Sequence, residues 1–162
     1  MRIKLAACIM LAGLLISPAM ADIAVRLELG PGFTAFVYAD IPLEDGIIGF
    51  GLDATPAHPD MYLVSFTPGP EFSPVGSTPD GDGIAGLVLP PTVVYGADLW
   101  LGTLLFGGTP AWVDLGYTPG DLTEGLATPD GFAAVTFSHG WYIPEPAALA
   151  LLACSALLLR RR

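Results

Sequence analysis

The sequence predicts an all-β fold, a single antiparallel β-sandwich of about eight or nine strands that occupies residues 22–143. Short stretches rich in Val, Ile, Phe, Tyr and Trp recur along this region, and turn residues separate them. Thr-Pro pairs punctuate these stretches at short intervals. No window has the apolar stripe with i, i+3, i+4 spacing and polar relief that a surface helix needs.

A leader precedes the first predicted strand. The chain opens on two basic residues within four positions, continues with an apolar run (LAACIMLAGLLI), and then places small residues at Ala19 and Ala21. This is the pattern of a signal peptide, with cleavage between Ala21 and Asp22. We therefore expect residues 1–21 to form a signal helix that is removed on export. An uncleaved N-terminal anchor is the alternative.

The predicted strands follow in order. Each is a short run of β-forming residues bounded by Gly, Pro, Asp or Ser. They are DIAVRLEL (22–29), FTAFVYAD (33–40), IIGFGLDA (47–54), MYLVSFT (61–67), IAGLVL (84–89), DLWLGTLLF (98–106), AWVDLGY (111–117) and FAAVTFS (132–138).

The turns between the strands carry a repeated signal. Thr-Pro begins at positions 55, 67, 78, 109, 118 and 128. Because proline fixes φ and lacks a backbone donor, each pair should end or edge a strand. Gly and Pro supply 32 of the 122 residues between 22 and 143, a level at which disorder is an alternative. Three tryptophans and many apolar residues favour a folded sandwich.

The C-terminal end has an uncharged apolar run that is short for a membrane span. It covers 13 residues, 147–159, where a relaxed transmembrane helix needs about 20. Three arginines follow it and should hold this end in the cytoplasm. A helix so short would strain or thin the bilayer. We expect a short transmembrane helix that anchors the chain temporarily.

The residues of this tail resemble a known sorting signal. The order is a Pro-Glu-Pro tripeptide, an apolar run with small residues, and a terminal arginine cluster. These are Pro144, Glu145 and Pro146, and then Arg160, Arg161 and Arg162. The pattern resembles the PEP-CTERM sorting signal, a motif also catalogued as the "ice-binding protein C-terminal" motif without implying ice binding. Residues 144–162 would then be the sorting tail.

That resemblance implies a location and a partner. It implies a bacterium of Gram-negative type, export through the inner membrane, and recognition by a membrane-embedded protease of the exosortase type. Processing near the Pro-Glu-Pro motif would release the protein to the cell surface or to an extracellular biofilm matrix rich in exopolysaccharide. We expect the chain to lie in the membrane only transiently.

The central region also resembles a family, the cohesin-like sandwich domains of secreted bacterial proteins. The resemblance rests on GIIGFGL (46–52), VSFTPG (64–69) and LWLGTLLF (99–106). It implies a jelly-roll-like sandwich of nine strands that binds partners and catalyses nothing. No contact motif for a dockerin partner can be carried over.

The charge of residues 22–143 is strongly acidic. The whole chain has six basic and 16 acidic residues, but only Arg26 among the basic ones lies in this region, against 15 acids. Such a surface disfavours nucleic acid and anionic lipid, and it suits solubility and divalent cations. Both cysteines, Cys8 and Cys154, lie in the end segments, so the domain must fold without disulfides or cysteine-zinc sites.

The best candidate metal site is the acidic loop Asp80-Gly81-Asp82-Gly83. Alternating aspartates on a glycine-rich loop can direct carboxylates at one hard cation such as Ca²⁺. The EF-hand pattern fails, because Pro91 stands where its bidentate glutamate belongs. An acidic turn without metal is the simpler interpretation, so no cofactor other than this possible Ca²⁺ is expected.

Catalytic motifs are missing from the sequence. There is no G-x-S-x-G, H-E-x-x-H or phosphate-binding glycine loop. The two histidines do not form an obvious pair with a nucleophile: His58 lies in a loop, and His139 follows Ser138, whose side chain would point to the opposite face of a strand. Paired carboxylates of a glycosidase need geometry that a sequence cannot show. We expect a protein that is not an enzyme.

The aromatic residues offer a binding alternative. Several aromatic residues could stack on sugar rings if they were exposed on one face: Tyr95, Trp100, Trp112, Tyr117 and Trp141. Core packing is the favoured interpretation for Trp100 and Trp112. Trp141, beside the tail, suits a membrane interface. We thus expect a non-catalytic surface or matrix protein, with an exopolysaccharide-binding module as the alternative and a secreted hydrolase as a third class. A carbohydrate module would expose at least two coplanar aromatic rings on one face.

Overall fold

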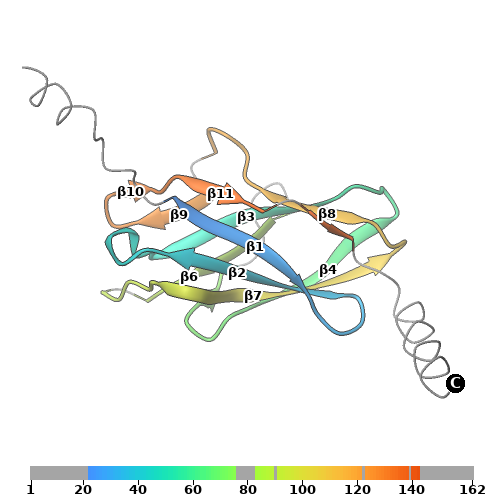
Figure 1. Ribbon diagram of the computed structural model, residues 1–162, viewed down its shortest axis with the longest axis horizontal. Coiled ribbons are helices and arrows are strands. Elements are labelled where there is room, and N and C mark those ends of the chain that lie inside the picture. Colours follow the sequence, from blue (N-terminus) through green and yellow to red (C-terminus); the bar gives the residue numbers. More distant parts are fainter. Residues whose placement is uncertain (1–21, 76–82, 90, 122, 139, 143–162) are drawn as a thin grey trace, which may run out of the picture.

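The computed structural model describes residues 22–75, 83–89, 91–121, 123–138 and 140–142. Within these residues the chain is all-β and forms two sheets that are mostly antiparallel (Figure 1). The one short helix described, η1 (Leu43–Asp45), is a single 3₁₀ turn. The prediction of an all-β fold is confirmed. The predicted signal helix and transmembrane helix lie outside the described residues.

The first sheet has five strands in the order β11-β1-β2-β7-β4. Their bounds are β1 (Ile23–Leu29), β2 (Thr34–Ile41), β4 (Met61–Pro68), β7 (Gly96–Gly108) and β11 (Val135–Phe137). The β1–β11 pair is parallel, and all other pairs in this sheet are antiparallel. The prediction of a purely antiparallel fold is therefore wrong at this edge. The chain leaves the other sheet after β10 and joins the first sheet alongside β1, in the same direction as β1.

The second sheet has seven strands around a central strand, β3 (Gly49–Pro56). One edge of β3 pairs with β6; along its other edge, the first half pairs with β9 and the second half with β8. The remaining bounds are β5 (Ser73–Pro74), β6 (Gly83–Leu87), β8 (Trp112–Gly116), β9 (Gly125–Thr128), β10 (Gly131–Phe132) and β12 (Trp141–Tyr142). The described part thus holds twelve strands, three of them only two residues long, where about eight or nine were predicted.

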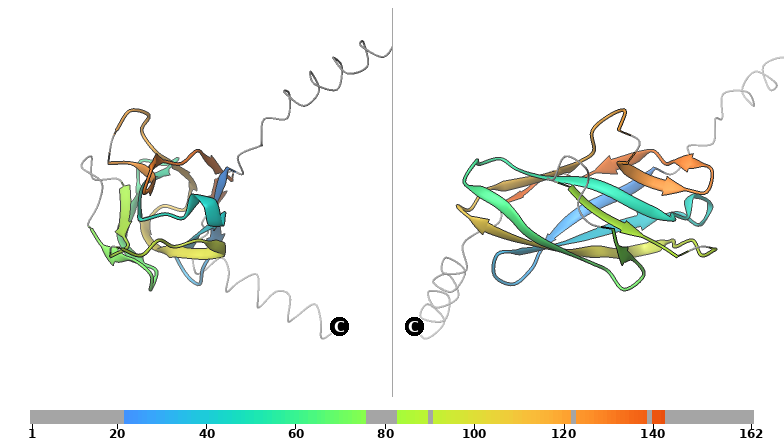
Figure 2. Two further views of the ribbon diagram at one scale, coloured as in Figure 1. Left: turned by 90° about the vertical axis from the view of Figure 1, so that its left-hand side faces the viewer. Right: turned by 180° about the vertical axis from the view of Figure 1, so that it is seen from behind.

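The strands alternate between a buried and a solvent-facing side, which brings the two sheets together. In β1 and β2 the buried residues fall at every second position, and in β3 Phe50, Leu52 and Ala54 do the same. Phe50 meets Phe66 of the other sheet edge to face, with ring centroids 6.0 Å apart. Each large apolar side chain buried here stabilises the fold by about 1.5–3 kcal/mol. The left view of Figure 2, turned by 90° from Figure 1, shows the strands of the two sheets around this core.

The Thr-Pro pairs end strands as the sequence predicted. Thr55-Pro56 and Thr67-Pro68 close β3 and β4, and Thr128 is the last residue of β9 before Pro129. The pairs at 109 and 118 follow β7 and β8 directly or after one residue. The pair at 78 lies outside the described residues. Thr-Pro pairs therefore mark the C-terminal ends of five of the twelve described strands.

Candidate functional site

The outer side of the five-stranded sheet carries a charged cluster around Arg26. On β1 the Arg26 guanidinium donates from Nε to Glu28 Oε1 at 3.2 Å and from Nη1 to Asp40 Oδ2 at 3.3 Å, and Nη2 donates to Asp98 Oδ1. Its Cζ also lies 5.3 Å from the ring centroid of Tyr38, its register partner on β2. Burial alone would lower the pKa of Arg26, but the hydrogen bonds with Asp98 and Glu28 and the charge of Asp40 raise it.

Local structure holds this cluster in place. Asp98 adopts a left-handed backbone conformation, φ 54°, and its amide donates to Asp40 Oδ1 at 2.7 Å. A non-glycine residue with positive φ is uncommon, and aspartate is one of the residues that tolerate it. This backbone conformation, in the third residue of β7, presents the Asp98 carboxylate to Arg26.

Aromatic rings continue from this cluster across the same side of the sheet. Tyr38 pairs with Trp100 in register, and the Trp100 ring meets Phe36 nearly at right angles, 82°, with centroids 6.4 Å apart. Phe36 and Tyr38 are also 6.4 Å apart and tilted by 58°. We call the solvent-facing side of this sheet the aromatic face. It carries Phe36, Tyr38, Tyr62, Val64, Trp100 and Leu105.

The tryptophans are not in the core. Trp100 is 37% exposed and Trp112 is 55% exposed, so the interpretation that they pack inside is wrong. The pairing of β2 with β7 shifts between Val37 and Tyr38, so that Leu101 falls in a bulge and is fully buried. Trp100 is then left on the solvent side, beside Tyr38. Trp112 lies on β8, in the other sheet.

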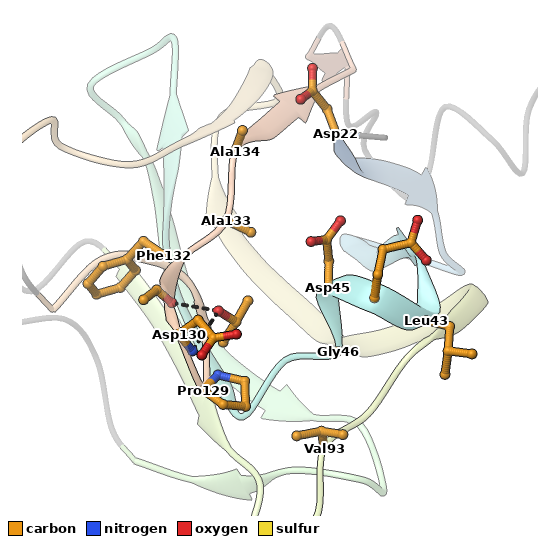
Figure 3. A pocket seen from close by; sticks show the side chains of 13 residues that line it. Asp22, Leu43, Asp45, Gly46, Val93, Pro129, Asp130, Phe132, Ala133 and Ala134 are labelled. Atoms are coloured by element: carbon orange, nitrogen blue, oxygen red, sulfur yellow. Dashed lines mark hydrogen bonds between the residues drawn. The ribbon is translucent and has the colours of Figure 1, made fainter. Parts of the chain in front are cut away.

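A second feature is an acidic pocket at one end of the molecule (Figure 3). It has a volume of about 540 Å³. Its four carboxylates are Asp22, Glu44, Asp45 and Asp130, which come from the start of β1, from η1 and from the turn between β9 and β10. Thr128 Oγ1 donates to the Gly131 carbonyl at 3.0 Å and accepts from the Asp130 amide at 3.3 Å, which fixes that turn. In Figure 3, Asp22, Asp45 and Asp130 occupy different parts of the rim.

The acidic pocket bears on the hydrolase alternative. A glycosidase needs two carboxylates that flank one bond at a separation of about 5–10 Å. Here three of the four acids sit on exposed turns and strand ends, with Asp45 half-buried. No lysine or arginine is among the residues that line the pocket. The pocket therefore has the character of a solvated acidic depression.

The residues predicted from the sequence fall in different places. Asp80 and Asp82, the sorting motif (144–146 and 160–162), Ala19 and Ala21 lie outside the described residues. Asp22 is described and lines the acidic pocket. The prediction that His58 is solvated is confirmed: its side chain is exposed, and Nδ1 accepts from the Asp60 amide at 3.2 Å.

The remaining predicted residues lie next to strand ends, in a strand, or outside the described part. Ser138 donates its amide to the Val25 carbonyl at 2.9 Å, and His139 lies outside. Tyr95 and Tyr117 are exposed, and the Tyr117 ring is 5.9 Å from that of Phe137. The backbone of Trp141 pairs with Val113 of β8.

Across the described residues, no three His, Cys, Asp or Glu side chains gather closely enough to hold a metal ion among them. In the same part of the chain, no helix has the length and apolar character to cross a membrane. In the comparisons with known proteins, no family model and no curated protein matches this chain.

Sequence reasoning missed the Arg26 cluster. It identified Arg26 only as the one basic residue of the domain. The Arg26 and Glu28 side chains share a face because they are two residues apart on a strand, which the sequence does show. Asp40 and Asp98 come from β2 and from the start of β7, and only the tertiary fold brings them to the guanidinium.

Proposed function

We propose that this chain is a non-catalytic protein of the cell surface or extracellular matrix that binds a partner through its aromatic face. The observation that carries the proposal is the outward position of Phe36, Tyr38 and Trp100 on a sheet whose other side is packed. Exposed apolar patches rimmed by charge are typical of interaction surfaces. Arginine, tyrosine and tryptophan, the types of Arg26, Tyr38 and Trp100, are also the residues that contribute most binding energy at interfaces.

We further propose that the chain reaches this location by export and C-terminal processing. The support is the sequence pattern at its two ends, a signal peptide over residues 1–21 and a PEP-CTERM-type tail over residues 144–162. An exosortase-type protease in the membrane would recognise that tail. We also infer that the two-sheet domain between them is a cohesin-like sandwich. The support is that nine of the described strands are three or more residues long, the number of strands that this resemblance implies.

The intact mass of the protein from its native host tests this proposal. Membrane, surface and medium fractions would be analysed separately. We expect a species that begins at Asp22 and ends near Pro144–Pro146 in the surface or medium fraction. A membrane-bound species that still ends in Arg162 would refute processing. The substitution Glu145→Ala should shift the mass and fraction of the first species and leave total expression unchanged.

The second candidate function is binding of exopolysaccharide, and one observation favours it. Exposed aromatic rings lie beside hydrogen-bonding carboxylates on the aromatic face, which is the chemistry that sugars need. The 58° and 82° ring angles do not form the coplanar platform expected of a flat sugar-stacking surface. The interaction with another envelope protein is therefore the leading form of the proposal.

The two forms are separated by ligand chemistry. Affinity electrophoresis of the purified protein through a gel that contains host exopolysaccharide would detect glycan binding. If the exopolysaccharide in the gel slowed the wild-type protein but not the Trp100→Ala variant, the carbohydrate-binding module would be favoured. Normal mobility, together with Trp100-dependent recovery of one envelope protein after crosslinking on intact cells, would favour the protein partner.

A further inference from the structure

A buried carboxylate in the loop before β9 has no counter-charge among the described residues. Glu124 is only 3% exposed, although glutamate is almost never fully buried unless it is paired. Its Oε2 accepts a hydrogen bond from the Thr118 amide. Its Oε1 is buried and has no hydrogen-bond partner among the described residues. A buried charge of this kind is costly unless a cation or a proton compensates it.

A second carboxylate lies beside it. Asp53, on β3, accepts from Thr118 Oγ1 at 3.4 Å, so one threonine contacts both acidic side chains. Asp53 is half-buried and Thr118 is exposed, so the pair lies next to a solvent-exposed residue, although Asp53 Oδ1 and Glu124 Oε1 are themselves buried. We call Asp53, Thr118 and Glu124 the carboxylate pair site.

The local backbone builds this site. The loop between β8 and β9 folds over β3 because Gly51 lets the Thr123 carbonyl approach closely. Gly125 then enters β9 at φ +112°, a conformation that only glycine adopts readily, and this positions Glu124 just before the strand. The loop is tied further by Asp121, whose Oδ1 accepts from the amide and hydroxyl of Thr123 at 2.7 and 2.6 Å.

The described strands beside Asp53 also leave space next to the pair. The register partners of Asp53 are Gly83 and Gly116, so neither neighbouring strand places a side chain beside it. A Cβ added at Gly116 would meet nothing within 4 Å. Because register partners point to the same side of a sheet, this open space lies on the side to which the Asp53 side chain points.

Among the described residues, no lysine or arginine side chain forms an ion pair with Glu124. Arg26 is the only lysine or arginine between residues 22 and 143. It lies on the other sheet, where its guanidinium pairs with Glu28, Asp40 and Asp98. Within the described part of the chain, positive charge for Glu124 can then come only from solvent, as a proton or as a bound cation.

We propose that the carboxylate pair site binds a hard divalent cation of the Ca²⁺ type. Two carboxylates balance its charge, and calcium completes its six to eight oxygen ligands with hydroxyl, carbonyl and water oxygens. With only two acids the affinity should be that of extracellular calcium modules, a dissociation constant on the order of 0.1–1 mM. The site differs from the Asp80–Asp82 loop predicted from sequence, and it does not depend on the proposed function.

Thermal unfolding of the full-length protein in detergent, with and without CaCl₂, tests the proposal. At 10 mM Ca²⁺ we expect the Tm to rise by at least about 4 °C over EDTA, as linkage predicts for a site of this affinity. Sodium chloride of equal ionic strength should give a smaller shift. Glu124→Gln should abolish the calcium shift, and Asp53→Asn should reduce it at least threefold. Calcium titration calorimetry should give about one site in the wild type and lose it in either variant.

Matched variants locate the effect. The exposed control Glu71→Gln and the acidic-pocket double variant Glu44→Gln with Asp45→Asn should keep the full calcium shift. The proposal is overturned if calcium gives no more stabilisation than sodium chloride, or if Glu124→Gln and Asp53→Asn keep the shift. It is also overturned if only Asp80→Asn with Asp82→Asn removes it. Should Glu124→Gln fail to fold, Asp53→Asn and the calorimetric titration decide the question.

Discussion

The contact between Gly51 and the loop that follows β8 gives a sharp test of how this fold is held together. In Gly51→Ala the new Cβ would overlap the Thr123 carbonyl oxygen and lie 3.3 Å from Glu124 Cα. Both are backbone atoms, so neither can rotate away as a flexible side chain would. The loop must therefore lift from β3, and with it the Glu124 carboxylate.

The magnitude follows from two opposing effects. Overpacking at a rigid contact costs about 1–3 kcal/mol. Replacing glycine with alanine returns about 0.4–1 kcal/mol through the lower entropy of the unfolded chain. The free energy of unfolding should fall by about 1–2 kcal/mol, which for a domain of this size lowers the Tm by about 4–8 °C.

Gly116→Ala is the matched control, because its added Cβ meets nothing within 4 Å. Differential scanning calorimetry of both variants should show a lower Tm for Gly51→Ala and an equal or slightly higher Tm for Gly116→Ala. If Gly51→Ala were as stable as Gly116→Ala, the loop would not pack on β3 as described, and the geometry of the carboxylate pair site would be wrong.

Two further perturbations probe other parts of the molecule. Arg26→Met should lower the free energy of unfolding by about 1–2 kcal/mol, because it removes exposed ion pairs worth about 0.2–1 kcal/mol each and leaves three carboxylates facing one another. Chemical denaturation should show that 0.5 M NaCl shrinks this loss, since salt screens the remaining repulsion, and an unchanged loss would contradict the cluster. The loss should be constant from pH 7 to pH 10. Because folding raises the pKa of Arg26, its stabilising contribution is complete below the pKa of the unfolded chain and is lost only as the pH rises through the pKa of the folded state. Both pKa values lie far above this range. Leu126→Ala, at a fully buried position in β9, should cost about 2–5 kcal/mol by the same assay, and a cost under about 1 kcal/mol would show that β9 is not part of the core.

The sequence was sufficient to predict most strands, since β-branched and aromatic runs between Thr-Pro turns have few other stable arrangements. It missed β9, whose four residues include one large apolar side chain, Leu126, and which is a strand because β3 and β10 pair with it. It also missed the parallel β1–β11 pair, because partners so distant in the chain leave no local pattern.

The candidate sites show the same division. The stretch LWLGTLLF is apolar throughout, so local pattern could not show that a bulge at Leu101 leaves Trp100 in solvent. Asp53 and Glu124 lie far apart in the sequence, and only the fold of the β8–β9 loop brings them to one threonine. The sequence therefore shows which residue types are present, but it does not show which of these side chains the fold brings into contact.

The most direct test of the central claim compares Trp100→Ala with Trp112→Ala in the native host. Both tryptophans are exposed, but only Trp100 lies on the aromatic face. The measured quantity is the fraction of processed protein that stays with the cell surface or matrix after washing. Loss of an interface hot spot costs about 2 kcal/mol or more, roughly a 30-fold drop in affinity, so Trp100→Ala should pass into the medium. Trp112→Ala should stay bound like the wild type. Equal retention of all three proteins would contradict a binding role for the aromatic face.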